Sequence, residues 1–146
     1  MFLYDQNRED EAMISKQDLQ EYSQIMKLIE SLDLQIEQEY NTYKSPSFSS
    51  GVRSNDPSDP VTRALARISR MKEERAELVS RKTEIENFID SIPDLKERAI
   101  CSYRYLLGYT WRATCQTLQG HTSYAMLMEY DRNWWNTRTQ PSEDMA

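Results

Sequence analysis

The chain has 146 residues, of which 38% are hydrophobic and 29% are charged, and its formal net charge at pH 7 is −6. Three glycines and five prolines are too few for the tight turns of a β-rich fold, so the composition favours an all-α protein with exposed amphipathic helices. The sequence has no run of about 18 apolar residues and no basic segment followed by an apolar one at its start. We therefore expect no membrane span and a cytoplasmic location.

Residues 1–10 show no sustained hydrophobic period and are expected to form a flexible N-terminus. From about Glu11 the pattern changes, because apolar residues recur at alternating steps of three and four. Such heptad spacing is typical of a helix that packs along another helix. It predicts a long helix over residues 11–43, whose apolar stripe is Tyr22, Ile25, Ile29, Leu32 and Ile36.

A second long helix is predicted over residues 60–92, after a polar loop at 44–59. Asp59 is placed to cap this helix and Pro60 to be its first residue, and Pro93 should end it. Arg75 and Lys82 interrupt the apolar repeat, and polar residues at such positions fix register or partner choice. The repeat itself consists of Ala64, Met71, Leu78, Ile85 and Ile92.

The two predicted helices most simply fold back on each other as an antiparallel helical hairpin, a coiled-coil-like arm over residues 11–92. The stripe Ile29, Leu32 and Ile36 should then pack against Met71, Leu78 and Ile85. Heptads also allow pairing between chains, so a homo-oligomer stays open. Residues 1–43 hold ten acidic and three basic residues. This acidic face is either a solvated surface that partly complements the second helix or a contact for a basic protein.

Residues 93–138 contain helix-ending and helix-capping residues that divide the segment into three short helices. Gly108 should end the first helix in a left-handed conformation, and Thr110 should cap the second. A further break at residues 119–121 precedes the third helix, for which Thr122 or Ser123 can act as N-cap. The expected inward faces are Leu95, Ala99, Tyr103 and Leu106, then Trp111, Thr114, Cys115 and Leu118, then Leu127, Tyr130 and Trp134. This is the outline of a helix-turn-helix head, followed by a disordered tail at 139–146.

The head resembles a known family in the junction RYLLGYTW (residues 104–111), in Leu118 and in its aromatic third helix. Over roughly the last third of the chain these features are similar to small phage proteins with a sigma factor region 4-like helix-turn-helix, relatives of the RinA and ArpU regulators. The resemblance implies a phage or prophage DNA-binding transcriptional regulator, similar to a late-gene activator. Its partner would be double-stranded DNA in the bacterial host cell.

Position in the expected head nominates the residues that would contact DNA. With the inward face of the third helix as above, Tyr124, Ala125, Met128 and Arg132 face outward. Near the turn, phosphate contacts are expected from Arg112, Thr122 and His121, with Arg104 as a further candidate. Trp135 points away from the expected inward face, so it is a candidate protein-interface residue together with Tyr124.

No enzyme activity, cofactor or metal site is expected. The single histidine, His121, has no nucleophile or carboxylate at a recognisable spacing, and neither a glycine-rich phosphate loop nor clustered metal ligands are present. Cys101 and Cys115 are fourteen residues apart without a CxxC motif. They are best interpreted as small buried hydrophobes.

Two other classes of function stay open. The third helix carries Arg132 against Glu129 and Asp131, and this weak basicity favours a protein-binding module. Such a module would act on host RNA polymerase or another host protein, as a cofactor or as an anti-defence inhibitor such as an anti-CRISPR. The other class is a terminase small-subunit-like or structural coiled-coil protein.

Overall fold

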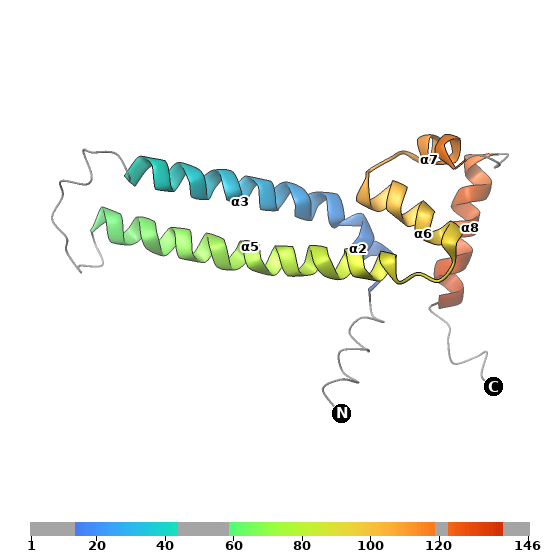
Figure 1. The fold of residues 1–146 in the computed structure, drawn as a ribbon, viewed down its shortest axis with the longest axis horizontal. Helices are drawn as coiled ribbons and strands as arrows, with labels where there is room; N and C mark the ends of the chain where they lie inside the picture. The colour runs from blue at the N-terminus through green and yellow to red at the C-terminus, as the bar shows by residue number, and fades with distance from the viewer. Residues whose placement is uncertain (1–13, 44–58, 119–122, 139–146) are drawn as a thin grey trace, which may run out of the picture. The chain divides into compact units, whose positions relative to one another are not determined.

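The computed structural model describes residues 14–43, 59–118 and 123–138 (Figure 1). Every element in this part of the chain is a helix, so the all-α prediction is confirmed. The elements are α2 (Lys16–Gln20), α3 (Tyr22–Tyr43), α5 (Pro60–Asp90), α6 (Leu95–Cys101), the π-helical turn η1 (Ser102–Leu106), α7 (Trp111–Thr117) and α8 (Tyr124–Arg138). None of these described helices has the length and hydropathy that a membrane crossing requires.

Several predictions fall on residues that the structure does not describe. They are the flexible N-terminus at 1–10, the loop before Asp59, the tail at 139–146, and the proposed contacts of His121 and Thr122. The chain divides into two compact units. Unit 1 contains residues 1–23 and 83–146, and unit 2 contains residues 24–82. The predicted head therefore shares unit 1 with α2 and with the last residues of α5.

The first described helix begins later than expected, at Lys16, because Ser15 is its N-cap and forms a capping box with Asp18. Ser15 Oγ accepts a hydrogen bond from the Asp18 amide at 3.3 Å, and Asp18 Oδ2 accepts one from the Ser15 amide at 2.8 Å. Each side chain thus satisfies a backbone donor that the first helical turn leaves free. A break at Glu21 then separates α2 from α3.

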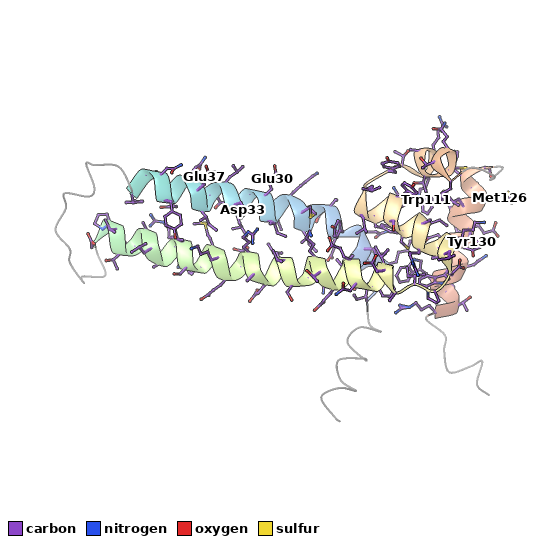
Figure 2. The ribbon with its side chains drawn as sticks, in the orientation of Figure 1. Glu30, Asp33, Glu37, Trp111, Met126 and Tyr130 are labelled. Atoms are coloured by element: carbon purple, nitrogen blue, oxygen red, sulfur yellow. The ribbon has the colours of Figure 1, made fainter. Side chains whose placement is uncertain are left out.

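In unit 2, α3 and α5 lie side by side and antiparallel (Figure 1). Arg67 of α5 pairs with Glu39 of α3. Arg75 comes later in α5, and it pairs with Asp33, which comes earlier in α3. Arg75 thus binds the facing helix from its position in the heptad repeat. In the acidic row on α3 that Figure 2 labels, Glu30 and Glu37 are exposed, and Asp33 accepts this pairing.

The seam of unit 2 is only partly covered. Its buried apolar side chains are Ile25, Ile29 and Leu32 of α3 and Ala64 and Ile68 of α5. Ile36, Met71 and Leu78, which were predicted to pack in this seam, are only half-buried. Two helices cover each other along one face, so residues at the flanks of the stripe keep contact with water.

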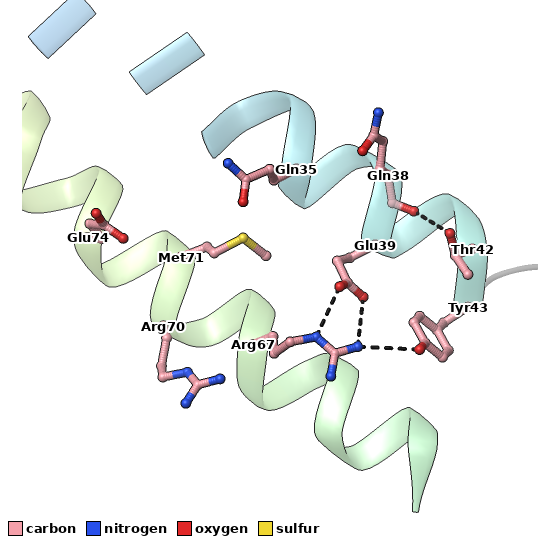
Figure 3. A pocket seen from close by; sticks show the side chains of 9 residues that line it. All are labelled: Gln35, Gln38, Glu39, Thr42, Tyr43, Arg67, Arg70, Met71 and Glu74. Carbon is pink, nitrogen blue, oxygen red and sulfur yellow. Dashed lines mark hydrogen bonds and ion pairs between the residues drawn. The ribbon is translucent and has the colours of Figure 1, made fainter. Parts of the chain in front are cut away.

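A polar groove between α3 and α5 is bridged by Arg67 (Figure 3). The guanidinium donates to Glu39 at 3.0 and 3.2 Å and to the Tyr43 hydroxyl at 3.3 Å. These bonds raise the pKa of Arg67. Because the strongest donor of the groove is already bound within the chain, we assign the groove no ligand.

The boundaries of α5 follow from its sequence. Asp59 accepts a hydrogen bond from the Thr62 amide at 3.4 Å, and Pro60 is the first helical residue, as predicted. The helix ends at Asp90, three residues before Pro93. The residue before a proline is biased away from the helical conformation, which accounts for the stop.

Unit 1 has its core where the end of α5 meets α2, α6 and α8. Ile85, Phe88, Ile89 and Ile92 are buried here, together with Ile14, Leu19, Tyr22, Ile100, Cys101, Tyr105, Leu127 and Trp135. The Tyr22 hydroxyl donates to Glu86 at 2.5 Å, and burial together with this bond raises the pKa of Tyr22.

The predicted inward face of the first head helix is wrong. Leu95 is 72% exposed, and Ala99, Tyr103 and Leu106 are only half-buried. The buried side chains are instead Glu97, Ile100, Cys101 and Tyr105. Because the buried stripe includes the charged residue Glu97, it does not stand out as apolar in the sequence. The π-helical turn η1 also changes the register of the residues that follow it.

Candidate nucleic-acid interface

The junction between η1 and α7 depends on Gly108 and Thr110. Gly108 has a φ of +74°, a left-handed conformation that L side chains resist, as the sequence predicted. Thr110 Oγ1 then accepts a hydrogen bond from the Ala113 amide at 3.1 Å and caps α7. Thr114 is completely buried on the inward face of α7, while Trp111, Cys115 and Leu118 are half-buried.

Arg104 is committed to this junction. Its Nη1 donates to the Tyr109 carbonyl at 2.6 Å, and its guanidinium lies 4.7 Å from the centre of the Trp111 ring (Trp111 is labelled in Figure 2). The side chain is half-buried. It therefore holds the turn between η1 and α7, and we no longer count it among the candidate phosphate contacts.

The first turns of α7 and α8 lie together. Ser123 Oγ accepts a hydrogen bond from the Met126 amide at 3.2 Å and so acts as a cap for α8. Arg112, in the first turn of α7, is exposed and its guanidinium lies 5.8 Å from the centre of the Tyr124 ring. A cation and an aromatic ring from two different helices thus form one surface at these helix starts.

The outer face of α8 differs from the predicted one at its centre. Tyr124 is 43% exposed, and Ala125 and Arg132 are also exposed, but Met128 is half-buried. Sequence reasoning missed Asn133 and Asn136, which are exposed on the same helix as Arg132. The buried residues Leu127, Asp131 and Trp135 are spaced by four and therefore define the inward face of α8. Asn133 and Asn136 lie on the opposite side of the helix, and this spacing is the signal that could have identified them.

Trp135 was predicted to be exposed, and this prediction is wrong. Its side chain is only 5% exposed, stacks on Phe88 at 5.7 Å and meets Trp134 edge-on at 5.1 Å. Trp134, expected to be inward, is half-buried, because α8 turns the next residue into the core. Of the two candidate protein-interface residues, Tyr124 alone is exposed.

The other basic residues of the head are engaged in its fold. Arg98 donates to the Ile92 carbonyl at 3.0 Å, and Arg138 donates to the Ile14 carbonyl at 3.3 Å. The ammonium group of Lys96 lies 4.3 Å from the centre of the Tyr130 ring. Arg112 and Arg132 are therefore the basic side chains of α7 and α8 best placed for an external anion.

Tyr130, which is labelled in Figure 2, fixes α8 to the start of α6 through a hydrogen bond to Asp94. Asp94 caps α6 by accepting hydrogen bonds from the amides of Lys96 and Glu97 at 3.0 and 3.3 Å. The Tyr130 hydroxyl donates to the same carboxylate at 2.5 Å. This bond lowers the pKa of Asp94 and raises the pKa of Tyr130 to about 12.

Asp131 does not belong to the outer surface of α8. It is completely buried, and Lys16 of α2 lies 2.8 Å from its Oδ2. Glu97 of α6 is also completely buried, and the Cys101 thiol donates to Glu97 Oε2 at 3.2 Å. Burial, then the hydrogen bond and repulsion from Asp131, raise the pKa of Glu97 to about 9. Glu129 is thus the exposed acid that faces outward beside Arg132.

Comparison with protein-family models, with curated proteins and with solved structures finds no match to this chain.

Proposed function

We propose that the chain is a DNA-binding transcriptional regulator that uses a helix-turn-helix formed by α7 and α8, with α6 and η1 as the supporting helix. In this proposal α8 enters the major groove and the start of α7 faces the DNA backbone. The antiparallel pair of α3 and α5 is the arm that precedes the head, and its heptads allow self-association. If the resemblance of residues 104–118 to phage regulators holds, the activity belongs to the cytoplasm of a bacterial host.

The observations that support the proposal are the contact of Arg112 with the Tyr124 ring and, separately, the exposed guanidinium of Arg132 on α8. Arg132 is exposed and has no hydrogen bond or ion pair with any other described residue. Burial of Asp131 supports the same proposal, since it removes one of the two acids that counted against DNA binding. Arginine is the side chain that most often reads guanine, and asparagine pairs with adenine. Arg132, Asn133 and Asn136 provide both chemistries on one helix.

Salt dependence of binding to duplex DNA tests this function. Binding to random duplex should weaken as salt rises, with a slope of about one unit in log–log form for each phosphate that a basic side chain neutralises. Arg112, the exposed arginine at the start of α7, predicts a shallow slope of about −1 from this surface. No measurable binding to any duplex at low salt, by a correctly folded chain, would reject the proposal.

A protein-binding module is the second candidate, because exposed apolar side chains lie near the same helix starts. Met126 is 59% exposed, Leu107 60% and Tyr109 38%. Exposed apolar groups of this size are common at protein contacts. Pull-down of one host protein, such as RNA polymerase, that survives high salt and is lost in Tyr124→Ala would favour this candidate, whether the module acts as a cofactor or as an anti-defence inhibitor. A purely structural coiled-coil role would show neither response.

A further inference from the structure

Three side chains that sequence reasoning left apart meet in the core of unit 1. Glu97 and Cys101 are one helical turn apart on α6, and Asp131 faces them from α8. All three are completely buried. A carboxylate oxygen of each acid and the thiol sulfur lie within 4.8 Å of one another. Such convergence from two helices gives a compact donor set of two oxygens and one sulfur.

Hydrogen bonds satisfy this cluster only in part. Cys101 donates to Glu97 Oε2, and the Lys16 ammonium is an ion partner of Asp131 Oδ2. Among the described residues no N–H, S–H or separate O–H group donates to Glu97 Oε1 or Asp131 Oδ1. The acid proton of Glu97 itself is therefore the one that can bridge the two carboxyl groups. A buried carboxylate oxygen without a donor costs free energy, so the site favours any cation that can replace that proton.

The charges of the cluster show which cation fits. With protons on Glu97 and Cys101, the negative Asp131 is balanced by the positive Lys16. Exchange of those two protons for one divalent cation leaves the total charge of the buried site unchanged. A monovalent cation exchanged for the Glu97 proton alone would also keep the charge, but it would leave Cys101 as a protonated thiol, which is not a metal ligand.

We propose that Glu97, Cys101 and Asp131 form a zinc site that links α6 to α8. Zinc binds thiolate sulfur at about 2.3 Å and carboxylate oxygen at about 2.0–2.2 Å, so tetrahedral ligands lie roughly 3.5 Å apart. This separation is compatible with donor atoms that lie within 4.8 Å of one another. A thiolate in the set favours zinc over magnesium or calcium. Lys16 stays beside Asp131 Oδ2 and orients that carboxylate from outside the ligand shell.

Binding exchanges protons for metal without any change of oxidation state. The Glu97 carboxyl and the Cys101 thiol each release one proton to the solvent as the zinc–oxygen and zinc–sulfur bonds form. The apparent affinity should consequently rise with pH. This zinc site does not depend on the DNA-binding proposal.

Cobalt(II), which accepts the same ligands, is the spectroscopic probe. The full chain is reduced, freed of metal with a chelator and titrated with cobalt(II) at several pH values. We expect a thiolate-to-cobalt charge-transfer band in the near ultraviolet, its displacement by zinc, and an affinity that rises with pH. Cys101→Ser should abolish the band, while Cys115→Ser, the matched control, should retain it.

The variant Glu97→Gln removes a proposed ligand while it should keep the chain folded. Its amide can donate to Asp131 in place of the acid proton, so circular dichroism should be unchanged, whereas cobalt affinity should fall by at least about 10-fold. A folded wild-type chain without the band, a band that persists in Cys101→Ser, or an affinity independent of pH would each overturn the proposal.

Discussion

Glu97 and Asp131 are two carboxyl groups that share one buried space, and they cannot both be ionised there at low cost. Lys16 lies beside Asp131, so Glu97 is the group whose charged form is disfavoured. Its pKa rises from 4.5 to about 9 through burial first and through Asp131 second. In the unfolded chain the same carboxyl would ionise near its ordinary value. Folding therefore takes up a proton at neutral pH.

That proton gives the folded state a defined pH dependence. Above pH 4.5 the unfolded chain has lost the Glu97 proton that the folded chain keeps up to about pH 9, so stability should fall as pH rises through this window. The slope is at most about 1.4 kcal/mol per pH unit. In Glu97→Gln this contribution is absent. Urea unfolding should be measured with a chelator present. From pH 5 to pH 9 the free energy of unfolding of Glu97→Gln should rise relative to that of wild type. A constant difference between the two proteins would contradict the shared-proton account.

Trp135 and Tyr124 test which aromatic residues of α8 support the core. Trp135 is 5% exposed and packs on Phe88, so Trp135→Ala should lower the free energy of unfolding by about 3–5 kcal/mol. Tyr124 is 43% exposed, so Tyr124→Ala should lower the free energy of unfolding by less than about 1 kcal/mol. Chemical unfolding of the two variants measures both values. Equal losses would mean that α8 is rotated from the orientation described.

At the scale of elements, the turn between η1 and α7 sets where the second head helix begins. Gly108 adopts a left-handed conformation, and a Cβ atom placed there would meet nothing within 4 Å. Backbone strain alone should then decide the effect of a substitution. Gly108→Ala should cost about 1–2 kcal/mol, and Gly108→Asn should cost less because asparagine tolerates this conformation. Thermal unfolding that ranks asparagine below alanine would refute that cause.

Element boundaries were predictable from sequence wherever a local signal existed. Asp59 with Pro60, Thr110, and Gly108 each act within a few residues, and the structure has each in the expected role. Faces were less predictable when they depended on partners far along the chain. Asp131 was expected on the outer surface of the third helix, but Lys16 of α2 pairs with it in the core, and buried Glu97, which the sequence did not single out, accepts a hydrogen bond from the Cys101 thiol. The exchanged roles of Trp134 and Trp135 follow from the same buried stripe.

At the scale of the whole molecule, the two units use their charges differently. In unit 2, Asp33 and Glu39 are neutralised by arginines of the facing helix. In unit 1, Arg98, Arg104 and Arg138 donate to backbone carbonyls. The net charge of −6 therefore says little about the small surface that Arg112 and Arg132 leave available.

DNA binding by the Arg112/Arg132 double alanine variant tests the central claim most directly. The matched control is the double variant Arg63→Ala and Arg70→Ala, which removes the same charge from exposed positions of α5 in unit 2. The account predicts that the head variant flattens the salt slope by about one unit through the loss of Arg112 and loses about 1–3 kcal/mol of specific binding through the loss of Arg132, while the control binds like wild type. Equal DNA affinity and equal salt slope in the folded head variant and in wild type would contradict it.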